Sequence, residues 1–339
     1  MAEWKQNRCE HGGKMNTLTV KKQNLEMLIS LLRIYGVCTQ SELKEKSNLQ
    51  ASTVSYLIRD LKEGGLVLDY GVDVIQGRRG KPGSKIGFNT GEINFLGLYV
   101  EDNFIDSYRI AIDGSTTKQW QVPFHQNDVR RAIIHTVREE VDADPTIKGI
   151  GIAIKGIVKN DGSIVSGVRY DDTKEAKSWN FSALAPDLRR LYPGIPIVVE
   201  NDANCAAELY EYSNRQSDED GSFIVYLIND KPFGIGCGLM LDGRLYRGYS
   251  GAAGEVKGEL KNHIEICTSM LDVQKVVLAG SMIQSLSQQD REKFVEQLKN
   301  LPCSVELAYG EKQLNPANGA ALIVINSYLS GYVDEVLKQ

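Results

Sequence analysis

A run of hydrogen-bonding side chains between positions 50 and 59 is the first set of residues in this sequence with evident binding chemistry. Its members are Gln50, Ser52, Thr53, Ser55, Tyr56 and Arg59. No carboxylate occurs in this run before Asp60. A surface that contacts DNA must avoid negative charge and offer groups to base edges and phosphates. The pattern therefore favours DNA binding over the alternative, a small three-helix bundle that binds protein or nothing.

A second polar segment, GRRGKPG at 77–83, is rich in arginine and glycine. Its core of Arg78, Arg79 and Lys81 resembles an AT-hook in which Lys81 replaces the usual second arginine. Such an extended basic strip fits a narrow minor groove, where the potential is most negative. The alternative is a flexible basic linker. If the strip contacts DNA, neutralising Arg78 and Arg79 together will weaken operator binding and lower the slope of log K against log salt concentration, whereas an unchanged slope will exclude the contact.

The sequence gives no sign of a metal site or a cofactor. Its six cysteines are all far apart, and none forms a CxxC pair. His263 and Cys267 are four positions apart on a possible helix, but a structural zinc site needs four ligands. We therefore expect six reduced thiols in a reducing compartment and no bound metal.

Three short helices are predicted before position 65, and they would position the first polar run. In two of them, apolar residues recur at intervals of three and four, the spacing of one helix face. These residues are Leu25, Leu28, Ile29 and Leu32 in segment 24–35, and Val54, Leu57, Ile58 and Leu61 in the segment that begins at 51. Between them, Thr39 and Glu42 have the form of a capping box at the start of a short helix that ends near Asn48. This succession is typical of a helix-turn-helix, whose last helix enters the DNA major groove.

Two strands are predicted around the basic strip, over 66–70 and 85–88, like the two-stranded wing of a winged helix. We therefore expect a polar leader at 1–15 and a winged helix-turn-helix DNA-binding domain at 16–88. The first 90 residues hold 14 basic and 9 acidic residues, whereas the rest holds 25 basic and 35 acidic ones. This asymmetry is typical of a polyanion-binding module joined to a different domain.

From Ile93 onward the sequence has an α/β pattern, and its 339 residues are enough for two or three domains. The expected strands cover 95–100, 107–112, 149–154, 195–199, 223–228, 237–241 and 275–278, with helices such as 129–141 and 204–214 between them. The longest aliphatic run, 320–325, is too short for a membrane span, and the N-terminus lacks an apolar signal-peptide core. We therefore expect a cytoplasmic protein with no membrane partner.

Four segments together resemble the ROK family of repressors, open reading frames and sugar kinases. They are GIGIAIKGIV at 149–158, VENDANCAAE at 199–208, GIGCGLMLDGRLYRG at 234–248 and GAAGEV at 251–256. With the expected winged helix, the chain resembles the repressor branch that includes xylose and N-acetylglucosamine repressors. The resemblance implies a two-lobed actin/hexokinase-like fold at 89–339, with a ligand cleft between the lobes. Lobe one would comprise about 89–200 plus the C-terminal helix, and lobe two about 201–324.

The resemblance also implies a sugar site. Asp202, beside Asn201, matches the aspartate that acts as general base in ROK kinases, and Glu255 matches the glutamate that binds sugar hydroxyls. A carboxylate and an amide suit a polyol, because a polyol both donates and accepts hydrogen bonds. Glu259 could supply a further ligand group. The alternative is that Asn201 and Asp202 only cap the helix that follows.

Departures from the family pattern argue against kinase activity. The Asp-x-Gly-x-Thr loop that holds the ATP phosphates is replaced by GLYVEDNF at 97–104, and the family's Pro-Gly by Lys155-Gly156. The zinc-binding histidine and the cysteine-rich zinc loop are absent after Glu255, and the helices that follow that loop are expected to be missing as well. Phosphoryl transfer requires a firmly held nucleotide, so Asp202 would remain as a ligand contact or a relic.

The sequence therefore predicts a homodimeric transcriptional regulator, with repression as its expected action, that binds double-stranded operator DNA and a sugar or sugar phosphate effector. It would control genes of carbohydrate metabolism. Two alternatives remain: a sugar kinase with an attached DNA-binding head, and a regulator whose lobes serve only for dimerisation.

Overall fold

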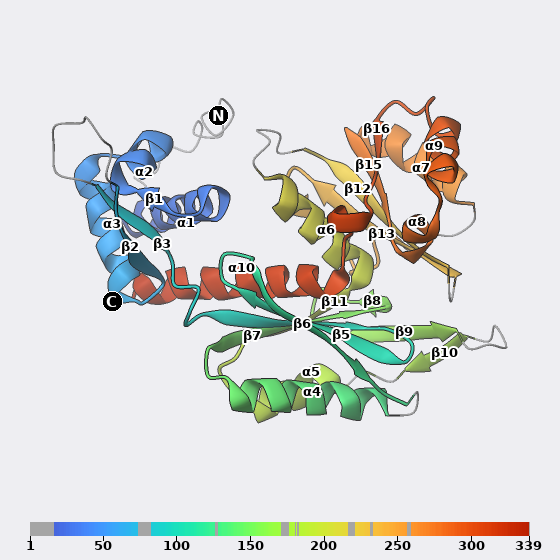
Figure 1. Cartoon of the computed structure of the whole chain (residues 1–339), viewed down its shortest axis with the longest axis horizontal. Coiled ribbons are helices and arrows are strands. Elements are labelled where there is room, and N and C mark those ends of the chain that lie inside the picture. Colours follow the sequence, from blue (N-terminus) through green and yellow to red (C-terminus); the bar gives the residue numbers. More distant parts are fainter. Residues whose placement is uncertain are drawn as a thin grey trace.

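The structure, a computed structural model, describes residues 17–73, 83–125, 128–170, 176–179, 181, 183–215, 221–230, 233–255 and 259–338. They form an N-terminal head (residues 17–88) and two α/β lobes, which Figure 1 shows. The long C-terminal helix α10 (Pro316–Val336) runs from the lobes to the head. As a result, the two ends of the described chain lie close together, although they are far apart in sequence.

The head contains the three predicted helices, followed by an antiparallel β-hairpin. The bounds are α1 Thr17–Tyr35, β1 Cys38–Thr39, α2 Gln40–Ser47, α3 Ala51–Glu63, β2 Val67–Asp73 and β3 Gly83–Phe88. The short strand β1 pairs with β3, which gives the sheet order β1-β3-β2. Helix α1 begins earlier than the predicted position 24, because its first turn is exposed and has no apolar stripe that the sequence pattern could register.

Local sequence accounts for the shape of the head. Both predicted apolar stripes are buried, and the predicted capping box is confirmed. The Thr39 hydroxyl accepts a hydrogen bond from the Glu42 backbone N–H at 3.2 Å, and the Glu42 carboxylate accepts one from the Thr39 backbone N–H at 2.7 Å. Asn48 then closes α2 with a φ of 56°, a left-handed conformation that asparagine tolerates well. The tight turn to α3 follows from this cap.

Lobe one is built on a five-stranded sheet of order β11-β7-β4-β5-β6. Its strands are β4 Asn94–Val100, β5 Phe104–Ala111, β6 Thr116–Pro123, β7 Ile147–Ile154 and β11 Ile197–Asn201. Helices α4 (Val129–Ala143) and α5 (Leu184–Leu191) cover one face of the sheet, and α10 covers the other (Figure 1). A small sheet extends this lobe with β8 Gly156–Val158, β9 Ile164–Tyr170 and β10 Ala176–Trp179.

Lobe two has a second five-stranded sheet, of order β14-β13-β12-β15-β16. Its strands are β12 Phe223–Asp230, β13 Phe233–Leu241, β14 Arg244–Leu245, β15 Lys275–Ala279 and β16 Ser304–Leu307. Alternate residues of β12 serve two cores: one lies under α6 (Asp202–Asn214), and the other lies under α7 (Leu260–Leu271) and α8 (Ser281–Ser285). Helix α9 (Gln288–Gln297) and the 3₁₀ turn Gly310–Lys312 complete the lobe. The period-two burial follows from strand geometry.

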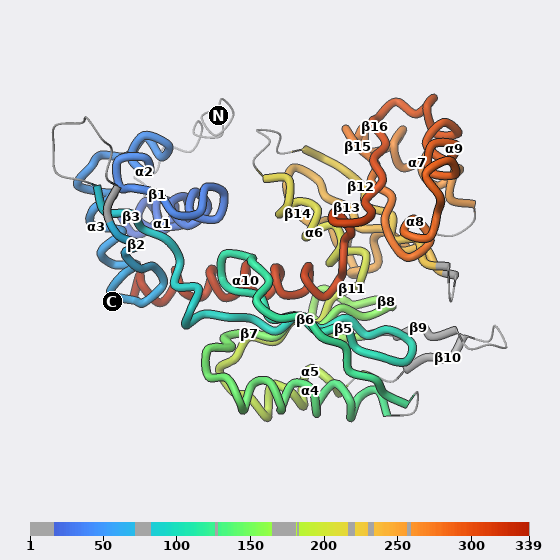
Figure 2. Tube along the Cα trace, viewed as in Figure 1, coloured from blue at the N-terminus to red at the C-terminus, as the bar shows by residue number. Residues whose placement is uncertain are grey.

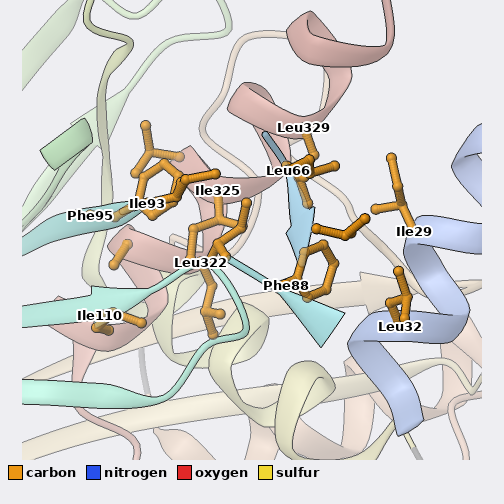
Figure 3. Close-up of a cluster of buried hydrophobic side chains, with 14 of the residues drawn as sticks. Ile29, Leu32, Leu66, Phe88, Ile93, Phe95, Ile110, Leu322, Ile325 and Leu329 are labelled. Atoms are coloured by element: carbon orange, nitrogen blue, oxygen red, sulfur yellow. The ribbon is translucent and has the colours of Figure 1, made fainter. Parts of the chain in front are cut away.

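Helix α10 joins the head and lobe one in a single hydrophobic core. Figure 3 shows Leu322, Ile325 and Leu329 of this helix between Phe88 on the head side and Phe95 on the side of lobe one. The tube in Figure 2 shows how the chain leaves lobe two and returns to the head through α10. The head is therefore docked on the same helix that covers the sheet of lobe one.

Three findings differ from the sequence-based expectations. Strands β6, β8, β9, β10, β14 and β16 were not expected. Four of them, β8, β10, β14 and β16, have four residues or fewer, and β6 is mostly exposed and polar. A helix does follow Glu259: α7 carries His263 and Cys267, as their spacing allowed, and occupies most of the connection to β15, which was expected to run almost directly into that strand. Helix α10 starts at Pro316, before the expected end of lobe two at 324, because Asn315 caps it by accepting a hydrogen bond from the Ala317 N–H.

Candidate functional site

The outer side of α3 presents the predicted hydrogen-bonding residues together. Gln50, Ser52, Ser55, Tyr56 and Arg59 are exposed, and Thr53 is half-buried. The apolar residues of the same helix are fully buried against α1 and α2. The 3.6-residue period of the helix therefore separates a core face from a polar face.

Several contacts hold this polar face in place. Ser55 donates a hydrogen bond to the Gln40 side chain at 2.9 Å. Lys21 donates one to the Tyr56 hydroxyl at 3.0 Å and pairs with Asp60 at 2.8 Å. The Arg59 guanidinium lies 5.1 Å from the centre of the Tyr56 ring. Lys21 thus neutralises Asp60, the first acidic group of α3.

Sequence reasoning missed Lys21 and Gln40 as members of this surface. They lie on α1 and at the start of α2, outside the helix that carries the polar run. The hydrogen bond from Lys21 to Asp60, supported by Tyr56, raises the pKa of Lys21 above its ordinary value. Gln40 could have been identified from the sequence, because it is the first residue of the capped helix that precedes the polar run.

The basic strip cannot be placed in the same way. Arg78, Arg79 and Lys81 lie outside the described residues. Strand β2 ends at Asp73, and its antiparallel partner β3 begins at Gly83. The strip therefore belongs to the connection of a hairpin, and its contact with DNA stays a prediction.

The second candidate site lies where three parallel strands of lobe one end. Strand β4 leads into Glu101 and Asp102, β7 into Lys155, and β11 into Asn201 and Asp202. The carboxyl ends of neighbouring parallel strands meet at one edge of a sheet, which is where ligands bind in open α/β folds. The structure therefore brings Asn201 and Asp202 together with three charged groups that the sequence pattern did not assign to the site.

Asn201 is the N-cap of α6, so it does cap the helix that follows, and its role as a ligand group stays a prediction that capping does not exclude. Its side-chain oxygen accepts hydrogen bonds from the N–H groups of Ala203 at 2.9 Å and Asn204 at 3.1 Å. Its amide nitrogen donates to the Gly156 carbonyl at 3.0 Å. All these groups belong to the protein, so capping and lobe packing already occupy Asn201 in this conformation.

Asp202 has a different environment, because it is buried beside a lysine. Tyr99 donates a hydrogen bond to one carboxylate oxygen at 3.3 Å, and the Ala203 N–H donates to the other at 2.9 Å. Burial raises the pKa of Asp202 to about 6, although the nearby positive charge of Lys155 opposes this shift. Burial also raises the pKa of Tyr99. A carboxyl group that titrates near neutral pH has the acidity expected of a general base.

Lys155 forms an internal ion pair with the segment that follows β4. Its ammonium group lies 2.6 Å from the Glu101 carboxylate and 3.8 Å from that of Asp102. Burial opposes the charge of Lys155, but these carboxylates outweigh it, and the pKa of Lys155 is raised. One oxygen of Asp102 is buried without a hydrogen-bond partner among the described residues. Two carboxylates at this edge would repel the phosphates of a nucleotide.

Contacts between the lobes border the site. Glu200 is almost fully buried and accepts hydrogen bonds from Asn204 at 3.0 Å and from Arg247 of lobe two at 2.7 Å. Asn160 of lobe one donates to the carbonyls of Gly248 and Tyr249, each at 3.0 Å. These groups were not predicted, because 47 residues separate Glu200 from Arg247 and 88 separate Asn160 from Gly248.

Glu255 and Glu259 are both exposed, and the residues between them lie outside the described part of the chain. Gly236 lies against Asp202 and Ala203, and the next residue, Cys237, lies against Gly254. Glu255 therefore directly follows a segment that borders the site. Glu259 is the N-cap of α7 and makes no side-chain capping bond. Their role as ligand groups stays a prediction.

A hollow of about 260 Å³ lies elsewhere in lobe two, lined by Tyr210, Phe223, Lys275 and their neighbours. Lys275 is already engaged there by the Tyr210 hydroxyl at 3.0 Å and Glu306 at 3.6 Å. The other residues that line it, Glu211, Asn214, Gly221, Gln274 and Ser304, are mostly polar. We place the candidate sugar site at the strand ends because the family resemblance assigns Asn201 and Asp202 to it.

The described residues were expected to hold neither a metal ion nor a membrane span, and two features of the structure bear on this. No group of three or more histidine, cysteine, aspartate or glutamate side chains within these ranges is arranged to hold a metal ion. Among the described helices, each is too short or too polar to span a bilayer.

Comparisons with known proteins agree with this architecture. Residues 109–258 match the sequence model of the ROK family. The chain is 24% identical to the xylose repressor of Lactiplantibacillus pentosus over 94% of its length and 84% of that protein. It is 26% identical to the xylose repressor of Bacillus subtilis over 70% of its length, but this match spans only 60% of the relative.

Solved structures with a similar fold include a regulator and a kinase. A ROK family transcriptional regulator, described as a homologue of the E. coli Mlc protein, covers 94% of this chain with a TM-score of 0.67 and 16% identity. A ROK family glucokinase from Streptomyces griseus covers 68% of the chain with a TM-score of 0.51 and 15% identity. The structural similarity shows that the two-lobed fold is shared. At identities this low it does not show a shared activity, which must be argued from the residues of the site.

Proposed function

We propose that this chain, which carries a ROK family domain over residues 109–258, is a transcriptional repressor that binds operator DNA through its head and a sugar between its lobes. The observation that carries the proposal is the exposed polar face of α3, whose first acidic group, Asp60, is paired with Lys21. It is supported by the match to a xylose repressor over 94% of the chain.

The head would bind DNA as a winged helix. Helix α3 would enter the major groove with Gln50, Ser52 and Thr53 toward base edges, and Arg59 would reach a phosphate. The basic strip between β2 and β3 would lie along the minor groove. A homodimer in the cytoplasm would place two such heads on half-sites about one helical turn apart.

The effector would be a sugar or sugar phosphate that binds at Asn201 and Asp202, with Glu255 and Glu259 as further ligand groups. D-xylose is the first candidate, because several relatives are named xylose repressors. Asp202 is buried, so a sugar can reach it only if its surroundings rearrange, and the Arg247 and Asn160 contacts between the lobes are the ones that we expect to loosen. Effector binding would therefore favour one arrangement of the lobes over another, which is the requirement for control of DNA affinity.

The same geometry argues against phosphoryl transfer. The Glu101 and Asp102 carboxylates and the Lys155 that they hold occupy the strand ends where ROK kinases bind phosphates. A kinase needs cationic or N–H groups free to neutralise the nucleotide. ATP consumption over a panel of sugars is therefore expected to match the background rate, and turnover that Asp202→Asn abolishes would restore the kinase alternative.

DNA binding can be tested with the full-length protein and fluorescent duplexes that tile the promoter region upstream of its own gene. We expect at least one duplex to bind about a hundred-fold tighter than a scrambled duplex at moderate ionic strength. Equal affinity for all duplexes would contradict the proposal. D-xylose should shift this affinity, and a shift absent with every sugar tested would favour the alternative in which the lobes only dimerise.

A further inference from the structure

Helix α6 extends from the candidate sugar site to the DNA-binding head. Its first residue is Asp202, and its thirteen residues give it a length of about 20 Å. Three residues from its middle to its other end, Glu208, Tyr212 and Arg215, lie around Arg33, which belongs to α1 of the head. The two proposed functional regions therefore meet opposite ends of one helix.

Arg33 makes two contacts across this boundary, and one of its partners contacts α6 in turn. Its Nη1 donates a hydrogen bond to the Asn326 side chain of α10. Asn326 in turn donates to Glu208 of α6 at 2.7 Å. The Arg33 guanidinium also lies 5.3 Å from the centre of the Tyr212 ring. One side chain of the head thus touches both helices that connect it to the lobes.

The surroundings of Arg33 destabilise its charged guanidinium group. Its Nε and Nη2 atoms are buried and have no hydrogen-bond partner among the described residues. Burial, followed by the nearby positive charge of Arg215, lowers the pKa of Arg33 to about 10. A buried guanidinium with unpaired N–H groups destabilises the arrangement that contains it. Small movements of α6 would therefore change the energy of this contact considerably.

Helix α6 packs closely against two neighbours, β13 of lobe two and α10. Its Ala203 lies directly against Gly236 and Gly238 of β13, where the absence of a side chain permits close approach. Its Cys205 lies in the same way against Gly319 of α10. Because the contacts at Gly238 and Gly319 are with backbone atoms of α6, rotation of side chains alone cannot absorb a shift of this helix.

We propose that Arg33 is the contact through which the head senses the position of α6, and therefore the state of the site at Asp202. The inference deepens the proposed function, since it names the path by which sugar binding would alter DNA binding. Arg33 acts here as a positioning residue: its guanidinium fixes α1 relative to α6 and α10.

Hydrogen–deuterium exchange of the full-length protein tests this path without DNA or sugar. Asp202→Asn removes the charge at the start of α6, and we expect it to change the exchange rates of the α1 amides between residues 25 and 35 several-fold. In an Arg33→Met background, the same substitution should leave these rates unchanged. Lys22→Gln is the matched control, because Lys22 also joins α1 to α10, through Asp334 at 2.7 Å, without touching α6.

Three results would overturn the inference. The first is that Asp202→Asn leaves the exchange rates of α1 unchanged. The others are that it changes them equally with Met or Arg at position 33, or that Lys22→Gln abolishes the change. If Arg33→Met does not fold, Arg33→Lys keeps the charge and loses the planar guanidinium, and the same loss of response is expected. Since the readout needs no ligand, a protein that binds no DNA would contradict the proposed function and leave this result standing.

Discussion

At the scale of single residues, burial sets the acidity of Asp202 more than its sequence neighbours do. The carboxyl group begins a helix, a position that ordinarily favours its charged form. Desolvation outweighs that effect and raises its pKa to about 6, from an ordinary value of 3.8. The protein therefore keeps a group with the acidity of a general base at strand ends that also hold Lys155 and two further carboxylates.

Replacement of Asp202 by asparagine should stabilise the protein at neutral and alkaline pH. Because the folded-state pKa is raised, the stability contribution of Asp202 is fully present below about pH 4 and is lost as the pH rises through 6. The asparagine amide mimics the protonated carboxyl group, so at pH 8 the free energy of unfolding should rise by up to about 3 kcal/mol, at about 1.4 kcal/mol per pKa unit. The gain should vanish near pH 4.

Urea denaturation of the two proteins between pH 4 and pH 8 measures this difference. Glu45→Gln, a change at an exposed carboxylate of α2, serves as control and should give no pH-dependent gain. A constant difference across the pH range would show that the pKa of Asp202 is not raised.

Replacement of Arg59 by alanine should weaken operator binding in a salt-dependent manner. Arg59 is exposed, and its pairing with Glu63 at 3.9 Å between exposed groups is weak enough to exchange for a phosphate. One lost phosphate contact should reduce the magnitude of the slope of log K against log salt by about 0.9. Fluorescence anisotropy at several salt concentrations measures the slope, and Arg131→Ala on the exposed side of α4 should leave it unchanged.

At the scale of elements, glycines decide how closely α10 packs. Gly97 and Gly151 of the lobe-one sheet lie against the backbone of α10, and Gly319 of α10 lies against the Cys205 carbonyl of α6. Helix α10 therefore rests on lobe one and α6 with almost no side-chain layer between the backbones. Helix α10 can therefore contact lobe one, α6 and the head at once. The residues of α10 that do not face lobe one or α6 pack in the hydrophobic core that it shares with the head.

Two glycines of α10 should respond in opposite ways to alanine. A Cβ at Gly319 would collide with the Cys205 carbonyl oxygen, so Gly319→Ala should lower the free energy of unfolding by about 1–3 kcal/mol. Nothing lies within 4 Å of a Cβ at Gly331, so Gly331→Ala should raise it by about 0.5–1 kcal/mol through helix propensity. Chemical denaturation compares them, and a gain from both would show that α10 and α6 are not in backbone contact.

At the scale of the whole molecule, the head and lobe one share one hydrophobic core through α10, and lobe two is joined through α6. A rearrangement of the lobes must therefore act on the head through these two helices. Besides the close packing of α6 on α10, polar contacts at Glu200 and Asn160 hold the lobes together in the described conformation. These polar contacts are the part of the boundary that can be exchanged for water or a ligand at a modest energetic cost.

Coupling between sugar and DNA must be reciprocal. If D-xylose lowers operator affinity by some factor, operator DNA must lower D-xylose affinity by the same factor, with about 5- to 150-fold expected for an allosteric protein. Anisotropy titrations of DNA with and without sugar give one factor, and calorimetric titrations of sugar with and without DNA give the other. Unequal factors, or none, would contradict allosteric control by D-xylose.

Short-range patterns in the chain were enough to predict several features of the fold and the site. Apolar residues at intervals of three and four predicted the core faces of α1 and α3, Thr39 and Glu42 predicted the cap of α2, and the absent phosphate loop at 97–104 argued against a kinase. Each of these signals lies within one turn or one loop, so neighbouring residues suffice to reveal it.

The meeting of distant groups, by contrast, became visible only in the folded molecule. Lys155 pairs with Glu101 across 54 residues, Arg247 with Glu200 across 47, and Arg33 with Asn326 across 293. No periodic pattern marks such partners, because a pair is fixed by the sheet order and by the close packing of α6 and α10 rather than by spacing along the chain. The acidity of Asp202 follows for the same reason, since burial is a property of the assembled lobes.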